Sequence, residues 1–450
     1  MNRSQNNMCG VVLSPGQSVE LVVERPAAGG AMIARVDRQI VLVTGAIPGE
    51  RVKARIERVS KHVAFASTAA VDEPSADRRE AFSDPLCGGC TYSHIAYARQ
   101  LAIKSDVIAD AFTRIGRIVL PAPVRVAGSA EEGYRMRARL HVRNRRVGFF
   151  REGTHEICDA RISRQLLPAT CDVIDRVTAV VRSLGSDAIR EIELSENVDA
   201  SERVVHVDAT QPLDARALDA MSTLEGLTPG PHVSDRITID GRPFTLRRHV
   251  LAFFQGNRYL LSDLVSHVSA RVPLGGAVID LYAGVGLFAV AAAALRGASV
   301  VAVEGDRVAA ADLHANASAA GGQLTSVRAD VEGFLRGLGG WRGGGVPRQA
   351  WDALSLSKGA AQPLEVLIVD PPRTGLSREA LDGILQVRPP RLVYVSCDVA
   401  TLARDARRII DTGYTIDRID AFDLFPNTPH VETVTVFDRD RTWCPAPAGP

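Results

Sequence analysis

The sequence predicts an α/β protein with a Rossmann-like, doubly wound parallel sheet, preceded by a small OB-like β-barrel and an α+β central domain. From about residue 274, apolar runs such as GAVIDLYAGVGLF, ASVVAVEGD and LEVLIVDPPR alternate with helix-like runs, which is typical of a parallel sheet covered by helices. Between residues 18 and 71, five short apolar or alternating runs are separated by Gly, Asp and Pro, as in a small barrel. From about 134 to 265, short strands alternate with helical runs.

These patterns divide the chain into three parts. Residues 11–71 form the barrel, residues 72–265 the central domain, which starts with a polar linker, and residues 266–450 the parallel-sheet domain. Within the last part, residues 337–363 are rich in glycine and read as a surface loop insertion. We assign no function to that insertion.

Composition narrows the class of protein. The 450 residues carry a formal net charge of +1, so no overall electrostatic field indicates binding to a nucleic acid or to a membrane. No apolar run of about 18 residues predicts a transmembrane helix. The polar N-terminus lacks the apolar core of a signal peptide, which favours a cytoplasmic protein. Seven cysteines, an odd number in a long chain, indicate free thiols, metal ligands or a nucleophile.

A glycine-rich turn predicts the cofactor site. DLYAGVGLF (280–288) joins a strand to a helix, and Gly284 and Gly286 let the backbone approach a ligand closely. Glu304 ends the next strand, where a carboxylate accepts hydrogen bonds from both hydroxyls of a ribose. Asp330 follows the third strand, in a position to contact adenine. Because a complete GxGxxG is absent, S-adenosylmethionine is favoured over NAD; a turn that binds no ligand is the other alternative.

The reactive groups are predicted at the ends of later strands. VDPPRTGL (369–376) places Asp370 at the edge of the sheet, and Arg373 stands where methyltransferases of amino groups often have an aromatic residue, so a ring carbon is the favoured target. Cys397 ends the following strand, and a thiolate that adds to carbon 6 of uracil activates carbon 5 for methylation. Glu432, at the head of the last strand, is the candidate base for the carbon 5 proton. Taken alone, a cysteine after an apolar strand is more often an inert buried thiol. The cofactor turn, Asp370 and Glu432 together favour a nucleophile at Cys397 instead.

An arginine-rich stretch predicts contact with RNA. YRMRARLHVRNRR (134–146) contains six arginines and no acidic residue. In a strand, one face would carry Arg135, Arg137, Arg139, His141, Arg143 and Arg145, and the other face would meet the core. A one-sided stripe of guanidinium groups suits phosphates, and a solvated charged face is the alternative. A target uridine must also leave its stack, because carbons 5 and 6 are attacked face-on.

Taken together, the motifs resemble the bacterial RNA 5-methyluridine methyltransferases, which modify uridine in ribosomal or transfer RNA. The resemblance covers nearly the whole chain. GGAMIARVDRQIVLVTG looks like part of a TRAM domain, an OB-like barrel that binds RNA, and the later segments FFQGN, DLYAGVGLFA, VEGD, VDPPRTGL, VSCDVATLARD and FPNTPHVETVTVFDR follow in family order. Each motif alone is weak, and their order together is specific.

The resemblance implies a role for each matching residue. Cys397 is the expected nucleophile and Glu432 the expected base. The residues expected to contact S-adenosylmethionine are Gln255, Tyr282, Glu304 and Asp370. Phe253 is expected to pack near the flipped base, with plain core packing as its alternative.

The resemblance also implies RNA as the partner and no membrane. By analogy alone, 23S ribosomal RNA is favoured over transfer RNA. Methylation of cytosine carbon 5 and a non-catalytic RNA-binding protein stay open as alternatives. The sequence does not define an oligomeric state, and we favour a monomer.

Many family members hold a [4Fe–4S] cluster on four cysteines, of which two form CGGC. Here Cys87 and Cys90 supply that pair and Cys158 is the candidate distant ligand. The position six residues before Cys87, where the family has its first cysteine, is Ala81. Three cysteines are one short of the usual set. The alternatives are a cluster completed by another residue such as Cys171, a residual cysteine pair, or zinc.

Overall fold

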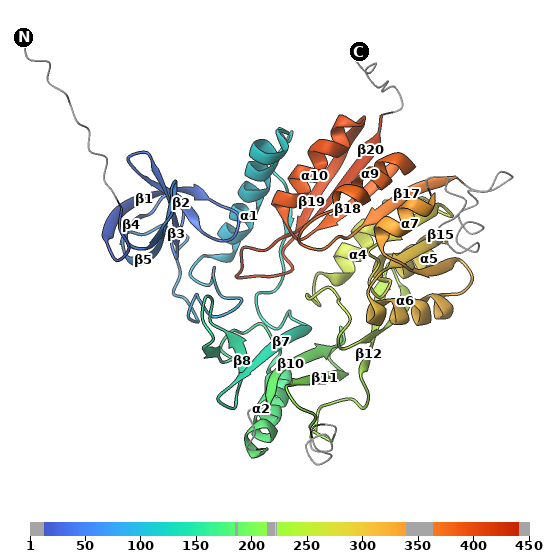
Figure 1. Cartoon of the computed structure of the whole chain (residues 1–450), viewed down its shortest axis with the longest axis horizontal. Helices are drawn as coiled ribbons and strands as arrows, with labels where there is room; N and C mark the ends of the chain where they lie inside the picture. Colours follow the sequence, from blue (N-terminus) through green and yellow to red (C-terminus); the bar gives the residue numbers. More distant parts are fainter. Residues whose placement is uncertain (1–12, 185–187, 214–220, 222, 339–362, 441–450) are drawn as a thin grey trace, which may run out of the picture.

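The computed structural model describes residues 13–184, 188–213, 221, 223–338 and 363–440. Figure 1 shows a barrel, a central sheet and a large sheet covered by helices. The predicted insertion at 337–363 lies outside the described residues, apart from its first two positions and its last. Within these ranges, no helix has the length and apolarity needed to cross a membrane.

The five N-terminal strands close into the predicted barrel in the order β1-β2-β3-β5-β4. Their alternating sequences explain the closure, because in β4 (RVKARIERV) every second side chain up to Ile56 is buried. Buried Glu50 anchors the start of β4 by accepting two hydrogen bonds of 2.6 Å from Arg78. The strands are β1 (Ser18–Pro26), β2 (Met32–Val36), β3 (Gln39–Thr44), β4 (Arg51–Val59) and β5 (Val63–Glu73).

The central region is a five-stranded sheet in the order β11-β10-β7-β8-β9. Helix α2 (Pro168–Ser183) covers it, and Val173, Ile174 and Val177 pack into one core with the strands. A separate hairpin, β12 (His232–Ile239) and β13 (Arg242–His249), leads towards the large sheet. The sheet strands are β7 (Arg137–Arg143), β8 (Arg146–Phe150), β9 (Ile157–Cys158), β10 (Ile189–Glu196) and β11 (Arg203–Ala209).

The large sheet has eight strands in the order β16-β15-β14-β17-β18-β20-β19-β6. The first five are parallel, whereas β20 lies antiparallel to both β18 and β19. Its strands are β14 (Ala277–Leu281), β15 (Ser299–Glu304), β16 (Leu324–Arg328), β17 (Leu364–Val369), β18 (Arg391–Ser396), β19 (Tyr414–Phe422) and β20 (Glu432–Arg439), with β6 (Val126–Ala127) at the edge.

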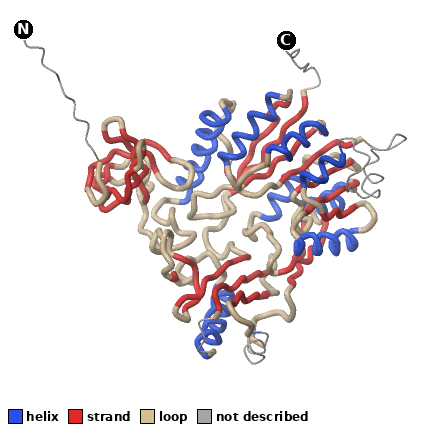
Figure 2. Tube along the Cα trace, in the orientation of Figure 1, coloured by secondary structure: helices blue, strands red, loops and turns tan. Residues whose placement is uncertain are grey.

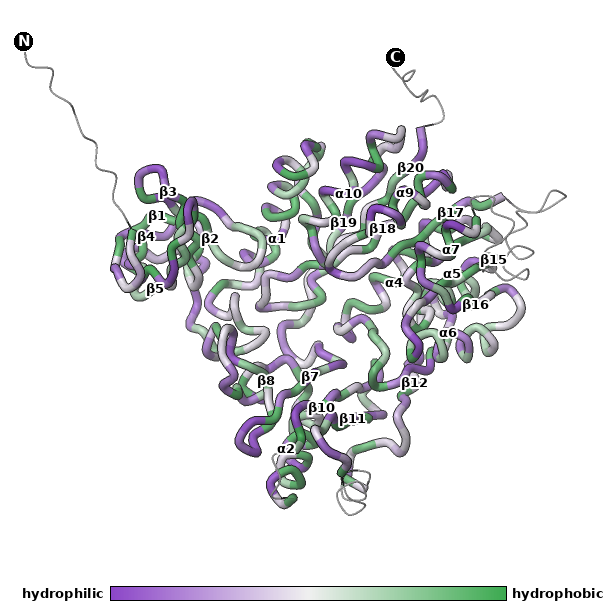
Figure 3. Tube along the Cα trace, in the orientation of Figure 1, coloured by the Kyte–Doolittle hydropathy of each residue, from purple (hydrophilic) through white to green (hydrophobic). Residues whose placement is uncertain are grey.

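Helices cover both faces of this sheet, as predicted for a doubly wound fold (Figure 2). Ile279 and Leu281 of β14 pack on the face of α7, α9 and α10, whereas Val278 packs on the face of α4, α5 and α6. Strands buried on both faces are apolar along most of their length, as β17 shows in Figure 3. The helices are α4 (Leu261–Ser269), α5 (Leu287–Arg296), α6 (Arg307–Ala320), α7 (Val331–Leu338), α9 (Arg378–Val387) and α10 (Val399–Asp411).

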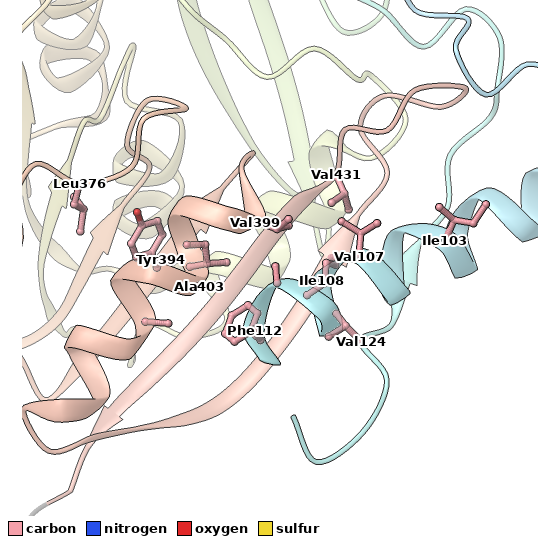
Figure 4. Packing of buried hydrophobic residues seen from close by; sticks show 14 of the residues in the cluster. Ile103, Val107, Ile108, Phe112, Val124, Leu376, Tyr394, Val399, Ala403 and Val431 are labelled. Atoms are coloured by element: carbon pink, nitrogen blue, oxygen red, sulfur yellow. The ribbon is translucent and has the colours of Figure 1, made fainter. Parts of the chain in front are cut away.

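A segment well before the large sheet in sequence also packs on it. Helix α1 (Tyr97–Ala111) continues into a π-helical turn, η1 (Phe112–Gly116), and β6 then pairs with β19. Figure 4 shows Val107, Ile108 and Phe112 packed against Val399 and Ala403 of α10. Residues of the segment 72–265 therefore contribute to the large sheet as well as to the central region, and the last two residues of β5 place the start of the segment in the barrel.

Candidate active site

The predicted glycine-rich turn lies at the carboxyl end of β14. Tyr282, Gly284 and Gly286 all have positive φ, of 59°, 57° and 96°. Only glycine adopts this region at little cost, so Tyr282 is held there by its surroundings. A Cβ on Gly286 would lie 2.8 Å from Leu313 Cδ1, which leaves no room for a larger residue. The turn thus brings the N-terminus of α5 to the sheet edge.

Glu304 fixes this turn against the neighbouring strand. It ends β15, where its Oε2 accepts a hydrogen bond of 2.8 Å from the Gly284 amide. Its Oε1 accepts one of 2.7 Å from the Asp306 amide. The carboxylate therefore lies beside the glycine turn, as expected for a group that binds ribose hydroxyls.

A cavity of about 480 Å³ opens at this edge of the sheet. It brings together most of the residues singled out from the sequence. Those that line it are Phe253, Gln255, Tyr282, Gly284, Glu304, Asp370, Cys397 and Glu432. Its wall also includes Phe288, Asp306, Arg373 and Phe425. The open space beside Gly284 and the carboxylates at the turn fit S-adenosylmethionine, which has no pyrophosphate to bind.

Buried carboxyl groups line one side of the cavity. Gln255 Nε2 donates a hydrogen bond of 3.1 Å to Asp370 Oδ2. Burial raises the pKa of Asp370 to about 7, and the bond from Gln255 opposes this rise. Asp280, fully buried in β14, has a pKa raised well above its usual range by burial and by Asp370. The site therefore favours a positively charged ligand beside these groups, such as a sulfonium.

Cys397 and Glu432 lie at adjacent ends of two paired strands. Cys397 directly follows β18, and Glu432 is the first residue of β20. The antiparallel register pairs Ser396 with Thr433. Cys397 and Glu432, the next residue on each strand, therefore lie next to each other at the end of the pair. Both line the cavity. The ladder between the strands thus fixes their separation.

Burial raises the pKa of both residues of this pair. Glu432 is 3% exposed, and its Oε1 has no hydrogen-bond partner. Burial and Asp370 raise the pKa of Glu432 well above its usual range, while Arg373 opposes the rise. Burial and then Glu432 raise the pKa of the Cys397 thiol to about 12, and Arg373 again opposes.

The sequence reasoning did not assign Arg373 and Phe425 to the site. Arg373 is the only cationic side chain among the described residues that line the cavity, and it is exposed there. Phe425 packs edge-on to His430, with ring centroids 6.1 Å apart. Burial and Arg373 lower the pKa of His430 to about 4, so its imidazole is neutral near pH 7. The motifs DPPR and FPNTPH were the available signals for both.

The two phenylalanines of AFFQ separate in the structure. Phe253 is 65% exposed at the cavity, which excludes core packing and leaves a face for a base. Phe254 is buried, and the Arg248 guanidinium lies 4.6 Å from its ring centre. Phe253 is thus placed to stack on an unstacked base.

Two predicted cofactor residues, Gly286 and Asp330, do not line the cavity, although Gly286 belongs to the turn at its edge. Asp330 turns to the first turn of α7 instead. Its Oδ1 accepts a hydrogen bond of 2.6 Å from the Gly333 amide in the first turn of α7. The side chain is 71% exposed. Asp residues favour such capping positions, which explains its orientation.

The arginine stripe differs in part from the prediction. Met136, Ala138 and Leu140 are buried as expected, but the opposite face is paired with acids from β10. Arg139 Nε lies 2.6 Å from Glu193 Oε1, and Arg137 Nη2 lies 3.8 Å from Glu193 Oε2. The acids are distant in sequence, so the run of arginines did not reveal them.

Arg135 lies before β7 and is half-buried, which also departs from the predicted exposed stripe. Its Nη1 donates a hydrogen bond of 2.7 Å to Gln165 Oε1, and its Nε donates one of 2.7 Å to the Arg137 carbonyl. No carboxylate of the described residues forms an ion pair with it. Burial lowers the pKa of Arg135, and the positive charge of Arg373 lowers it to a smaller extent. The guanidinium groups of Arg135 and Arg373 are therefore electrostatic neighbours. Arg145 lies in the β7–β8 turn, with a positive φ of 58°.

Cys87, Cys90 and Cys158 come together as predicted, but Cys171 does not join them. Cys171 lies on α2 in the central core, and its charged neighbours are Arg161 and nearby aspartates. Among the described residues, no group of three or more His, Cys, Asp or Glu side chains is arranged to hold a metal ion. The cysteines present do not fit the four-ligand site that the resemblance implies.

This geometry, a glycine turn held by a carboxylate at the edge of a doubly wound sheet, is that of the S-adenosylmethionine-dependent methyltransferase class. Comparison with known families agrees. The family described as tRNA (Uracil-5-)-methyltransferase matches residues 227–440, and the TRAM domain matches residues 13–69.

Relatives match over almost the whole chain. The 23S rRNA (uracil(1939)-C(5))-methyltransferase of Halomonas elongata is 32% identical, over 93% of this chain and 89% of the relative. The enzyme of the same name from Pseudomonas putida is 30% identical, over 94% of each chain. The crystal structure of Pyrococcus abyssi tRNA (uracil-54, C5)-methyltransferase in complex with S-adenosyl-L-homocysteine superposes with a TM-score of 0.69 at 23% identity, over 93% of this chain and 99% of that one.

The chain therefore belongs to the S-adenosylmethionine-dependent RNA uracil-5-methyltransferases with an N-terminal TRAM domain. Membership in this family excludes the two alternatives that the sequence left open, which were methylation of cytosine and an RNA-binding protein without catalytic activity. Both the barrel and the large sheet occur where the sequence predicted them.

Proposed function

We propose that this enzyme methylates carbon 5 of a uridine in 23S ribosomal RNA, with Cys397 as nucleophile and Glu432 as base. The observation that carries the proposal is the placement of these two residues on paired strand ends that face one cavity. Relatives named as 23S rRNA enzymes support the RNA class. Transfer RNA is the second candidate, supported by the name of the matching family.

In the first step, the thiolate of Cys397 forms a bond to carbon 6 of the uracil, and the electron pair of the 5,6 double bond moves towards carbon 5 and oxygen 4. Arg373 is the cation that stabilises the thiolate and the negative charge, because it is the group that opposes the high pKa of Cys397. Phe253 holds the flipped base against its exposed ring face.

S-adenosylmethionine would supply the methyl group for carbon 5: the bond between its sulfonium sulfur and that methyl would break, and S-adenosylhomocysteine would leave. Gln255, Asp370 and Glu304 are the chain's groups that hold and orient it. Glu432 next removes the proton from carbon 5, and the electron pair of that bond re-forms the double bond as Cys397 leaves carbon 6. A carboxylate with a raised pKa holds the proton well, which suits this role.

The test is incubation of the purified protein with methyl-labelled S-adenosylmethionine and either 23S rRNA or tRNA, each transcribed without modifications. We expect label in 5-methyluridine of the ribosomal transcript. Cys397→Ala should abolish labelling while cofactor binding persists. Label confined to tRNA would replace the ribosomal assignment, and turnover by Cys397→Ala would contradict the mechanism.

A further inference from the structure

The cysteine turn offers too few ligands for an iron–sulfur cluster. Cys87 interacts electrostatically with both Cys90 and Cys158, and the Cys90 thiol donates a weak hydrogen bond of 4.0 Å to the Ser163 carbonyl. Cys87 and Cys90 are 3% and 0% exposed, and Ala81 offers no ligand atom. The three thiols that come together here are one short of the four ligands that a cluster would need.

A glutamine side chain occupies the space against the two glycines of this turn. Gln165 is 1% exposed, and its Nε2 donates a hydrogen bond of 2.7 Å to the Gly88 carbonyl. A Cβ on Gly89 would lie 2.3 Å from that nitrogen, and Gly89 has a φ of 89°. The positive φ of Gly89 and the close approach of Gln165 therefore both favour glycine at this position.

Gln165 also holds Arg135 of the RNA-binding side. Its Oε1 accepts a bond of 2.7 Å from Arg135 Nη1. Its carbonyl accepts one of 2.9 Å from the Arg135 amide. Arg135 is in turn an electrostatic neighbour of Arg373 at the cavity. Hydrogen bonds thus run from the cysteine turn through Gln165 to Arg135, whose charge is felt by Arg373 at the cavity.

We propose that in this chain the CGGC turn works without an iron–sulfur cluster, and that Gln165, seated on its glycines, is a positioning residue that orients Arg135 towards a phosphate of the RNA. The second half rests on the proposed function, because Arg135 is taken as an RNA contact. A guanidinium without a carboxylate partner, fixed by two neutral acceptors, keeps its charge available for a phosphate.

The first experiment measures metal content. The full chain is purified without oxygen, and a portion is treated with ferrous iron and sulfide. We expect a colourless protein without stoichiometric iron or acid-labile sulfide, and the same melting temperature for both portions. A stoichiometric cluster whose visible absorbance disappears in Cys158→Ser would overturn the metal-free turn.

The second experiment compares Gln165→Leu, which removes the side-chain bonds to Arg135, Tyr134 and the Gly88 carbonyl, with Gln165→Glu, which keeps an acceptor for Arg135. Gln386→Leu, at an exposed position of α9, is the control. Gln165→Leu should raise KM for RNA about tenfold, the effect of losing one hydrogen bond to a charged group, with kcat and cofactor affinity nearly unchanged. Gln165→Glu should recover most of the affinity.

The outcomes separate this inference from the proposed function. A wild-type enzyme that labels no RNA contradicts the proposed function and leaves the metal measurement valid. A wild-type enzyme that methylates RNA, with Gln165→Leu unchanged in KM, contradicts the positioning role. A parallel fall of kcat, cofactor affinity and melting temperature in Gln165→Leu would show a general structural role and also contradict it.

Discussion

The reactivity of Cys397 in the resting enzyme is the sharpest consequence of the site's electrostatics. Burial and Glu432 raise the pKa of this thiol to about 12 from an ordinary 9.0. Only the thiolate reacts with iodoacetamide, so at pH 8 Cys397 should be alkylated about 1000-fold more slowly than an ordinary cysteine. Its rate should rise about tenfold per pH unit up to about pH 12.

The assay follows alkylation of each cysteine by peptide mass spectrometry over a range of pH. Glu432→Gln is the informative perturbation, because it removes the neighbour that raises the pKa of Cys397, and alkylation at pH 8 should become faster. Asp382→Asn, on the surface of α9, is a control that leaves the cavity unchanged. Rapid alkylation of wild-type Cys397 at pH 8, unaffected by Glu432→Gln, would refute the reasoning and point to a thiolate already present.

Three further changes probe the same cavity. Glu432→Gln should lower turnover by a factor of about 10² to 10⁴ and trap a methylated protein–RNA adduct, visible on a denaturing gel; full turnover would exclude Glu432 as the base. Gly286→Ala should destabilise the fold by about 1–3 kcal/mol, because of its positive φ and the contact with Leu313, and should weaken cofactor binding in calorimetry; an unchanged melting temperature would contradict this. Because Asp370 is protonated below its pKa of about 7, cofactor affinity should rise from pH 6 to pH 8, and Asp370→Asn should abolish that dependence; a pH-independent wild type would argue against ionised Asp370 as a contact.

Local sequence patterns were sufficient where a residue's role follows from the end of a strand. The turn around Gly284, the carboxylate Glu304 and the pair of Cys397 and Glu432 all sit at strand ends that the apolar runs already marked. Parallel strands bring their carboxyl ends to one edge, where Gly284, Glu304 and Cys397 lie. Glu432 reaches the same edge because it begins the antiparallel β20. The barrel was similarly evident from alternation in strands such as β4.

Patterns failed where the decisive partner lies far along the chain. The arginine stripe looked unopposed until β10 placed Glu191 and Glu193 across from it. Asp330 was expected at a ligand because of its position after a strand, but an amide in the first turn of α7 competes for its side chain. The packing of α1 on α10 depends on contacts about 290 residues apart, which no local periodicity encodes.

The antiparallel β20 has a consequence for how such an enzyme changes its substrate. The proposed nucleophile and base, Cys397 and Glu432, lie at strand ends joined by backbone hydrogen bonds between β18 and β20. The proposed RNA contacts, Arg135 and Phe253, lie instead outside this pair of strands. Substitutions at the RNA contacts can therefore change which RNA is bound without changing the spacing of Cys397 and Glu432.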